Sequence, residues 1–241
     1  MIVHDTLPNG VRLVTETMPH VRSVSLGVWL TRGSRHETAD QSGIAHFIEH
    51  MLFKGTDRRS AQDIAQQFDS MGGNLDAFTS KEYAGYYIKV MDEHLPRAFD
   101  ILSDLVLHPA FPADEVEREK KVILEEIKMV EDTPDDLVHE LFAEEFWRDH
   151  PLGRPILGTP ETVSGFTRDA LQQYFRGAYV GRNLIVAAAG HFDHAQLRAL
   201  VVDAFGSVAD AGADWHDTTP AIHPPQLERV KDLEQSHIVI G

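Results

Sequence analysis

Five short stretches of this chain predict β-strands. They are rich in β-branched and aromatic residues, and apolar and polar positions often alternate along them. They are residues 11–16, 24–30, 74–79, 83–90 and 183–189. Pro8-Asn9-Gly10 is a turn signal, and it separates the first of these strands from an extended run before it. The third and fourth strands are close enough in the chain to form a hairpin.

Apolar residues recur at helical spacing between these strands, which predicts α-helices. The helical segments are residues 44–53, 61–71, 95–107, 114–130, 134–147, 169–179 and 194–205. Gly72-Gly73 ends the second helix, Asp114 is the expected N-cap of the fourth, and Pro134 starts the fifth. Helices, strands and hairpins interspersed in this way indicate the α+β fold class.

The composition changes near the end of the chain. Residues 1–206 carry the regular pattern and are interpreted as one domain, whereas residues 207–227 are rich in Ala, Asp, Gly and Pro and are interpreted as a linker. Residues 228–232 and 237–240 resemble two short strands. A terminal apolar strand needs a sheet to join. It could pair with the sheet of the same domain, or residues 228–241 could begin a second domain, and the residues leave both interpretations open.

Charge and composition narrow the class of protein. The chain has 38 Asp and Glu against 22 Lys and Arg, a formal net charge of −16, which disfavours nucleic acid and anionic membranes as partners. No apolar run reaches the roughly 18–20 residues that cross a bilayer. The start, MIVHD, lacks the basic and apolar regions of a signal peptide, so we expect a cytoplasmic protein. Because the chain has no cysteine, any metal must be held by His, Asp or Glu.

The sequence H-F-I-E-H at residues 46–50 is the most specific chemical feature. On a helix His46 and His50 share one face, because they are four residues apart, and can bind one zinc ion. Glu49 lies near the edge of that face, where it can act as general base toward a water that the metal activates. The alternative is a pair of ordinary surface histidines. The apolar residues in 44–53 argue against it, because buried unpaired imidazoles are costly.

A catalytic zinc site needs a third protein ligand and an open fourth position. The predicted helix at residues 114–130 offers Glu119 and Glu126, which are seven residues apart and therefore on one face. Glu125 is also available, about 100° further round the helix. A solvated charged face explains any one of these glutamates equally simply, and spacing does not choose between Glu125 and Glu126.

Four segments, in order along the chain, resemble the pitrilysin-type metallopeptidases, relatives of the mitochondrial processing peptidase and insulin-degrading enzyme. H-x-x-E-H is the inverted zincin motif, and HFIEHMLFKGT at residues 46–56 is similar to the active-site helix of that family. Residues 72–83 resemble its edge strand and residues 117–127 its distal glutamate helix. Residues 152–159 resemble a loop of the bacterial members.

The resemblance implies one Zn²⁺ per chain, bound by His46, His50 and Glu126, with Glu49 as the general base. It thereby resolves the choice of glutamate that spacing leaves open. It also gives Glu119 an outer role at the catalytic site, where it would orient a ligand or a water. The implied fold is a mostly antiparallel sheet flanked by helices, as in one half of a mitochondrial-processing-peptidase-like metallohydrolase.

The resemblance also implies how a substrate binds. A peptide would add as a further strand along the edge segment, through Asn74, Asp76, Ala77 and Phe78. Asp76 stands where many relatives have Asn, which leaves that side-chain contact open but not the backbone pairing. The implied activity is that of a zinc endopeptidase acting on small or unfolded polypeptides.

Members of the family usually have two homologous halves, and an Arg and a Tyr of the second half help close the site. This chain ends about where the second half would begin. We therefore expect an N-terminal half that needs a homologous C-terminal half or second subunit, self-associates, and is weak or inactive alone. The alternative is a non-catalytic peptide-binding or scaffold subunit that completes a chamber with a partner. Such relatives typically lose the His or Glu of the motif, whereas this chain keeps all three. A non-peptidase metallohydrolase is a third interpretation, which the edge-strand segment disfavours.

Overall fold

The computed structural model describes residues 1–210, 218–223, 227–232 and 234–241. Its strands are β1 Ile2–Thr6, β2 Arg12–Thr17, β3 Ser23–Leu30, β4 Asn74–Thr79, β5 Ala84–Met91 and β6 Leu184–Gly190. Its α-helices are α1 Ile44–Leu52, α2 Ala61–Met71, α3 Leu95–Leu107, α4 Ala113–Asp132, α5 Pro134–Phe146, α6 Pro160–Gly165, α7 Arg168–Ala178 and α8 His194–Phe205. Short 3₁₀ turns include Ser34–His36 before α1 and Pro151–Gly153 after α5.

The six strands form one sheet in the order β1-β2-β6-β3-β5-β4. Every neighbouring pair is antiparallel except β2 and β6, which run parallel with Val14 opposite Ala187. This confirms the α+β class and the mostly antiparallel sheet. Strand β4 lies at one end of the sheet, and no further described strand pairs with its outer side. An unpaired edge of this kind can accept another strand.

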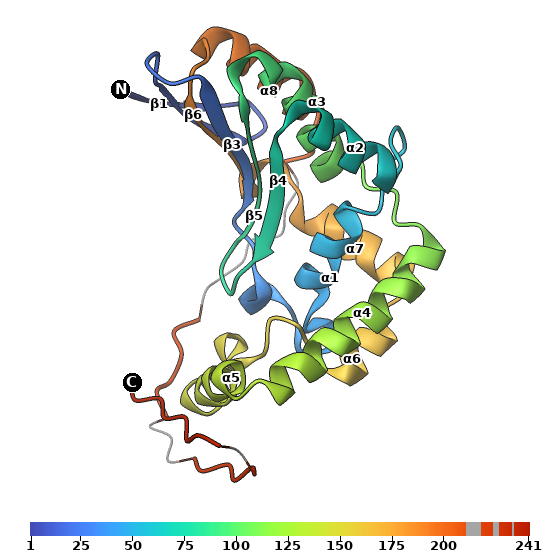
Figure 1. Cartoon of the computed structure of the whole chain (residues 1–241), viewed down its shortest axis with the longest axis vertical. Helices are drawn as coiled ribbons and strands as arrows, with labels where there is room; N and C mark the ends of the chain where they lie inside the picture. Colours follow the sequence, from blue (N-terminus) through green and yellow to red (C-terminus); the bar gives the residue numbers. More distant parts are fainter. Residues whose placement is uncertain (211–217, 224–226, 233) are drawn as a thin grey trace.

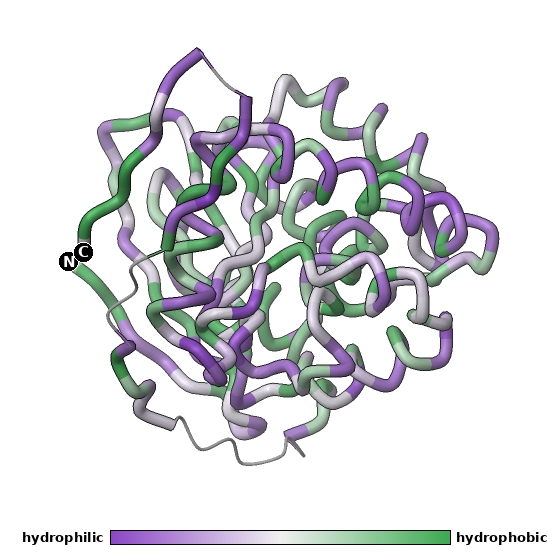
Figure 2. The backbone as a smooth tube through the Cα atoms, turned by 90° about the horizontal axis from the view of Figure 1, so that it is seen from below, coloured by the Kyte–Doolittle hydropathy of each residue, from purple (hydrophilic) through white to green (hydrophobic). Residues whose placement is uncertain are grey.

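The helices that contact the strands lie on one face of the sheet, whereas α5 lies below it (Figure 1). Along β5 the side chains alternate accordingly: Tyr86, Ile88 and Val90 are buried, whereas Tyr87, Lys89 and Met91 are exposed. Helices α8 and α3 lie beside the sheet, with α2 next to α3. Helices α1 and α7 lie near the end of β4, and α4 crosses outside α1 (Figure 1). Hydrophobic stretches lie mainly inside this arrangement (Figure 2). The described part of the chain has no helix long and apolar enough to cross a membrane.

One predicted helix start needs correction, and one helix was not predicted. Helix α4 begins at Ala113 with Pro112 as its N-cap, so the prediction of Asp114 as N-cap is wrong. Asp114 instead lies in the first turn, where a carboxylate favours the positive end of the helix dipole. Helix α6, Pro160–Gly165, was not predicted, because its six residues are too few to show a helical period.

The two strands predicted near the end of the chain are not formed. The described residues 227–232 and 234–241 contain no strand. The chain end lies beside α5 instead, where His237 Nδ1 is 2.6 Å from Asp135 Oδ1 and Gly241 lies against the ring of Phe142. A strand requires a pairing edge, and this segment meets a helix face. The predicted linker at 207–227 falls partly outside the described residues, and the domain boundaries stay a prediction.

Candidate metal centre

Helix α1 is fixed by its apolar face and by its first turn. Phe47, Ile48 and Met51 are fully buried, which leaves His46, Glu49 and His50 on the remaining face. The N-cap Gly43 has φ +94°. A Cβ at that position would lie 2.6 Å from the carbonyl oxygen of Leu157, so only glycine fits.

A buried carboxyl group completes the start of α1. Glu37 accepts hydrogen bonds from the backbone N–H groups of Gly43 and Ala45, each at 2.8 Å. Burial raises the pKa of Glu37 to about 8, against the opposing effect of these two hydrogen bonds. Arg154 donates to the Glu37 carbonyl oxygen at 3.0 Å and so links this turn to the loop after α5. Sequence reasoning missed Glu37, because its partners lie on another element.

The structure brings together His46, His50 and Glu126. Glu126 Oε2 is 3.8 Å from His46 Nε2 and 3.6 Å from His50 Nε2. One ligand atom from each of the three residues lies within 4.8 Å of the others. Ligands about 2.0–2.1 Å from a tetrahedral zinc ion stand roughly 3.3 Å apart, so this spacing suits a metal rather than direct hydrogen bonds. The donor set of two imidazoles and a carboxylate also suits zinc.

His46 is held in the form that a metal ligand needs. Burial lowers the pKa of His46 to about 4, and the neighbouring His50 adds to this effect. The ring is therefore neutral at pH 7 and keeps a lone pair on one nitrogen. Among the described residues His46 Nδ1 is buried without a hydrogen-bond partner.

Glu49 lies next to the metal ligands and is bonded to the edge strand. It accepts a hydrogen bond from the hydroxyl of Thr79, the last residue of β4. Burial raises the pKa of Glu49, although this hydrogen bond opposes the effect. The carboxylate is thus more basic than an exposed one, which suits a group that accepts a proton. Sequence reasoning missed Thr79, whose only signal was its position at the end of the predicted strand.

Glu119 lies behind the metal ligands. Its Oε2 is 2.9 Å from His50 Nδ1, and its Oε1 is 2.7 Å from Lys54 Nζ. Burial alone would raise the pKa of Glu119, but the hydrogen bonds from Lys54 and His50 outweigh it and hold this pKa below its ordinary value. Lys54 was not identified from the sequence, although it lies four residues after His50 in the resembling segment.

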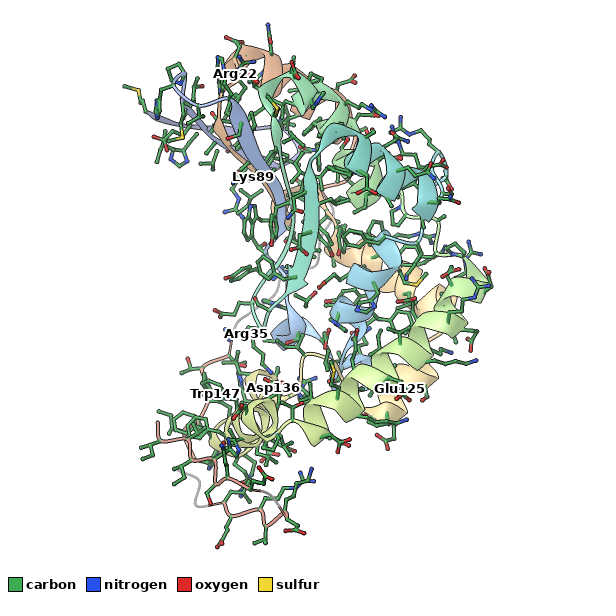
Figure 3. The ribbon with its side chains drawn as sticks, in the orientation of Figure 1. Arg22, Arg35, Lys89, Glu125, Asp136 and Trp147 are labelled. Carbon is green, nitrogen blue, oxygen red and sulfur yellow. The ribbon has the colours of Figure 1, made fainter. Side chains whose placement is uncertain are left out.

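Glu125 points away from this cluster. Its carboxylate pairs with Lys128 at 2.6 Å and is 72% exposed, and it is labelled on α4 in Figure 3. Of the two glutamates that spacing could not separate, only Glu126 therefore lies beside the histidines.

The predicted substrate residues follow the outer edge of the sheet. Asn74 and Asp76 are exposed on β4, whereas Ala77 and Phe78 are partly buried. Asp76 accepts a hydrogen bond from the hydroxyl of Tyr87 at 3.1 Å. The ring of Phe78 packs on the aromatic side chains of Trp29, Tyr83 and Tyr87. The backbone edge that leads to Glu49 is thus accessible, and its use by a substrate stays a prediction.

The inverted H-x-x-E-H helix and the fold of the six-stranded sheet place the chain in the class of M16-type peptidases. The chain belongs to the insulinase family, peptidase family M16, whose model matches residues 12–160. A second model, the peptidase M16 inactive domain, matches residues 165–241. The resemblance to pitrilysin-type metallopeptidases is thereby confirmed.

Curated relatives of the chain are longer than it is. The uncharacterized zinc protease YmxG of Bacillus subtilis is 46% identical over 241 residues, which cover 100% of this chain and 59% of YmxG. An uncharacterized zinc protease of Mycobacterium leprae is 44% identical over 245 residues, 100% of this chain and 55% of that protein. The chain thus spans little more than half the length of these relatives.

Solved structures show the same fold. A peptidase M16 inactive domain from Pseudomonas fluorescens matches with a TM-score of 0.85 and 19% identity, over 92% of this chain and 54% of that one. A Helicobacter pylori protease matches with a TM-score of 0.83 and 24% identity, over 92% and 54%. The first half of the periplasmic protease PqqL of Escherichia coli matches with a TM-score of 0.81 and 24% identity, over 91% and 48%.

Proposed function

We propose that this chain is the metal-bearing part of a zinc endopeptidase that hydrolyses small or unfolded polypeptides. The observation that carries the proposal is the convergence of His46, His50 and Glu126 beside Glu49, at the end of the free edge strand β4. Membership of family M16 and the zinc-protease names of the relatives support the same activity. One such cluster of ligands is present among the described residues, which supports one Zn²⁺ per chain.

Zinc bound by these three residues would act as a Lewis acid on the scissile carbonyl and lower the pKa of the attacking water. Glu49 takes a proton from that water as the water oxygen bonds to the carbonyl carbon. The same carboxyl group then gives the proton to the amine as the C–N bond breaks. Thr79 donates a hydrogen bond to Oε2 of Glu49, which keeps that oxygen beside the end of β4 and leaves Oε1 for the proton transfer.

Strand β4 would hold the substrate. An extended peptide can pair with the backbone of residues Asn74, Asp76, Ala77 and Phe78, and such pairing gives affinity with little demand on side chains. Since Thr79 ends this strand and bonds Glu49, a peptide paired with β4 would run toward the base. This geometry favours substrates that are extended, such as short or unfolded polypeptides.

Full activity would also require groups that this chain does not contain. Relatives extend well beyond the region matched here, and we propose that a homologous second half or subunit closes the site. Loss of positioning groups commonly costs about 100-fold or more in rate. The chain alone should therefore bind zinc but cleave peptides weakly. It should also self-associate, because apolar residues such as Ile238 and Ile240 are exposed.

Adding the second half in trans tests this part of the proposal. Turnover of a quenched peptide should rise strongly when both halves are mixed, and sedimentation should show association of the isolated chain. A monomeric chain with full activity that the second half fails to raise would show that the 241 residues suffice.

A non-catalytic peptide-binding or scaffold subunit is the alternative function. It would use the same edge strand but would not need the base or the ligands. The structure retains Glu49 beside all three ligand side chains, and this favours the enzyme.

Glu49→Gln separates the enzyme from the scaffold. The amide keeps the volume of the side chain but cannot accept the proton of water, so turnover should fall by about 10²–10⁴-fold while zinc content is unchanged. Glu125→Gln, an exposed residue of the same type, serves as the control. Turnover of Glu49→Gln within tenfold of the unchanged chain, with the second half present, would contradict the assignment of the base.

A further inference from the structure

Lys54 lies just beyond the end of α1 and forms an ion pair with a buried partner. Its ammonium group is 2.7 Å from Glu119 Oε1, and the Glu119 side chain is only 5% exposed. The other oxygen of Glu119 is 2.9 Å from Nδ1 of His50. Lysine, carboxylate and imidazole thus form one continuous chain of contacts that ends at a proposed zinc ligand.

This chain of contacts fixes the tautomer of His50. An ionised carboxylate can only accept hydrogen bonds, so Nδ1 of His50 carries a hydrogen, and in the neutral ring that a metal requires the lone pair is on Nε2. Nε2 is the atom that faces Glu126, at 3.6 Å from Oε2. His46 differs, because its Nδ1 has no hydrogen-bond partner among the described residues. His50 is therefore the imidazole that the protein itself orients.

A carboxylate held at one oxygen can still rotate, because the terminal torsion of a glutamate side chain has a broad energy minimum. Contacts at both oxygens remove this freedom. Lys54 supplies the second contact, and it also balances the charge of a carboxylate that is shielded from water.

We infer that Lys54 is a positioning residue of the metal centre, which acts through Glu119 to preset His50 for zinc. The inference rests on the proposed function, since it takes His50 to be a zinc ligand. The sign of the change in zinc affinity on removing Lys54 distinguishes a positioning role from simple charge balance. Removing a positive charge near a cation site should strengthen zinc binding by Coulomb attraction alone, whereas losing a positioning residue should weaken it.

Zinc affinity and imidazole tautomers, measured on the 241-residue chain, test the inference without any need for activity. Lys54→Met should weaken zinc binding by about 10–100-fold, the range found for outer partners of metal ligands. Lys54→Arg should restore binding to within a few fold. Nitrogen NMR of the zinc-free chain should show one His50 tautomer in the unchanged and Lys54→Arg chains, and a mixture in Lys54→Met. The control is Lys128→Met, which removes an exposed lysine from α4 and should change neither readout.

A double variant tests whether Lys54 acts through Glu119. Glu119→Gln weakens the same contact, so Lys54→Met should add little further loss of affinity in its presence. Lys54→Gln replaces Lys54→Met if thermal unfolding shows that the methionine variant is not folded. Zinc affinity that is unchanged or higher in the folded Lys54 variant, or full additivity with Glu119→Gln, would overturn the inference alone. Absence of zinc binding by the unchanged chain would instead refute the proposed function.

Discussion

Replacing Glu37 by Gln should make the stability of the fold much less sensitive to pH. Glu37 is 2% exposed, and its carboxyl group accepts hydrogen bonds from the N–H groups of Gly43 and Ala45, so it completes the first turn of α1. Burial raises its pKa to about 8, from an ordinary value of 4.5. Gln has nearly the same shape and one carbonyl oxygen for these donors, but it does not ionise.

The direction of the effect follows from proton binding. The folded chain binds the Glu37 proton more tightly than the unfolded chain, so the stability this group contributes is complete below pH 4.5. It is lost as the pH rises to about 8. A pKa of about 8 against 4.5 corresponds to about 5 kcal/mol over the whole window. Between pH 5 and 8.5 the expected loss is about 4 kcal/mol.

Urea unfolding, followed by circular dichroism in the presence of a chelator, measures this effect. Other groups also titrate between pH 5 and 8.5, so the informative quantity is the free energy of unfolding of Glu37→Gln minus that of the unchanged chain. This difference should grow by about 4 kcal/mol on going to pH 8.5. Glu125→Gln, at an exposed position, should follow the unchanged chain at every pH. A constant difference for Glu37→Gln would refute the assignment of a raised pKa to this carboxyl group.

Three further outcomes are expected. Glu126→Gln should lower zinc affinity by more than about 100-fold because it removes a ligand, whereas Glu125→Gln should keep the affinity of the unchanged chain. Metal analysis would reject the ligand assignment if only Glu125→Gln lost zinc. Thr79→Val removes the hydrogen-bond donor to Glu49, so turnover with the second half present should fall about tenfold. The pH–rate profile should also move to higher pH, because this hydrogen bond lowers the pKa of Glu49. An unchanged profile would count against the contact. His46 should titrate near pH 4 in proton NMR of the zinc-free chain, and a midpoint above pH 6 would show that the ring is not buried as described.

Much of the fold could be predicted where local signals at the ends of an element agree with its periodicity. Helix α2 begins and ends as predicted, because Ser60 and Asp63 form a capping box and Gly72 adopts φ +61° at its end. Helices α3 and α8 also have their predicted bounds. The parallel pairing of β2 with β6 could not be predicted, since it depends on contacts between strands far apart in the chain.

The prediction of two terminal strands was wrong for a related reason. Residues 228–232 and 237–240 have the composition of strands, but composition does not specify a pairing edge. The described chain end lies along α5. Just before it, Lys231 Nζ donates to the carbonyl oxygen of Glu131, near the end of α4, at 2.7 Å.

The candidate site also has residues that the sequence could predict and residues that it could not. The spacing of His46 and His50 is a local property of one helix, so the motif alone indicated their common face. Glu126 lies on a second helix and was selected only by resemblance. Lys54 and Thr79 could not be given partners from the sequence, because Glu119 and Glu49 reach them across the fold.

These contacts attach each part of the candidate site to a different element. Glu37 holds the start of α1 from the preceding turn, Glu119 on α4 holds His50, and Thr79 on β4 holds Glu49. The last contact matters most for the proposed function, because β4 is also the strand along which a peptide would pair. A peptide aligned by the backbone of β4 is thereby aligned with the base, and a change of register by one residue would move its carbonyl groups by about 3.3 Å relative to Glu49. Such a shift exceeds the tolerance of a catalytic geometry. We therefore propose that the register of a peptide on β4 contributes to the selection of the scissile bond.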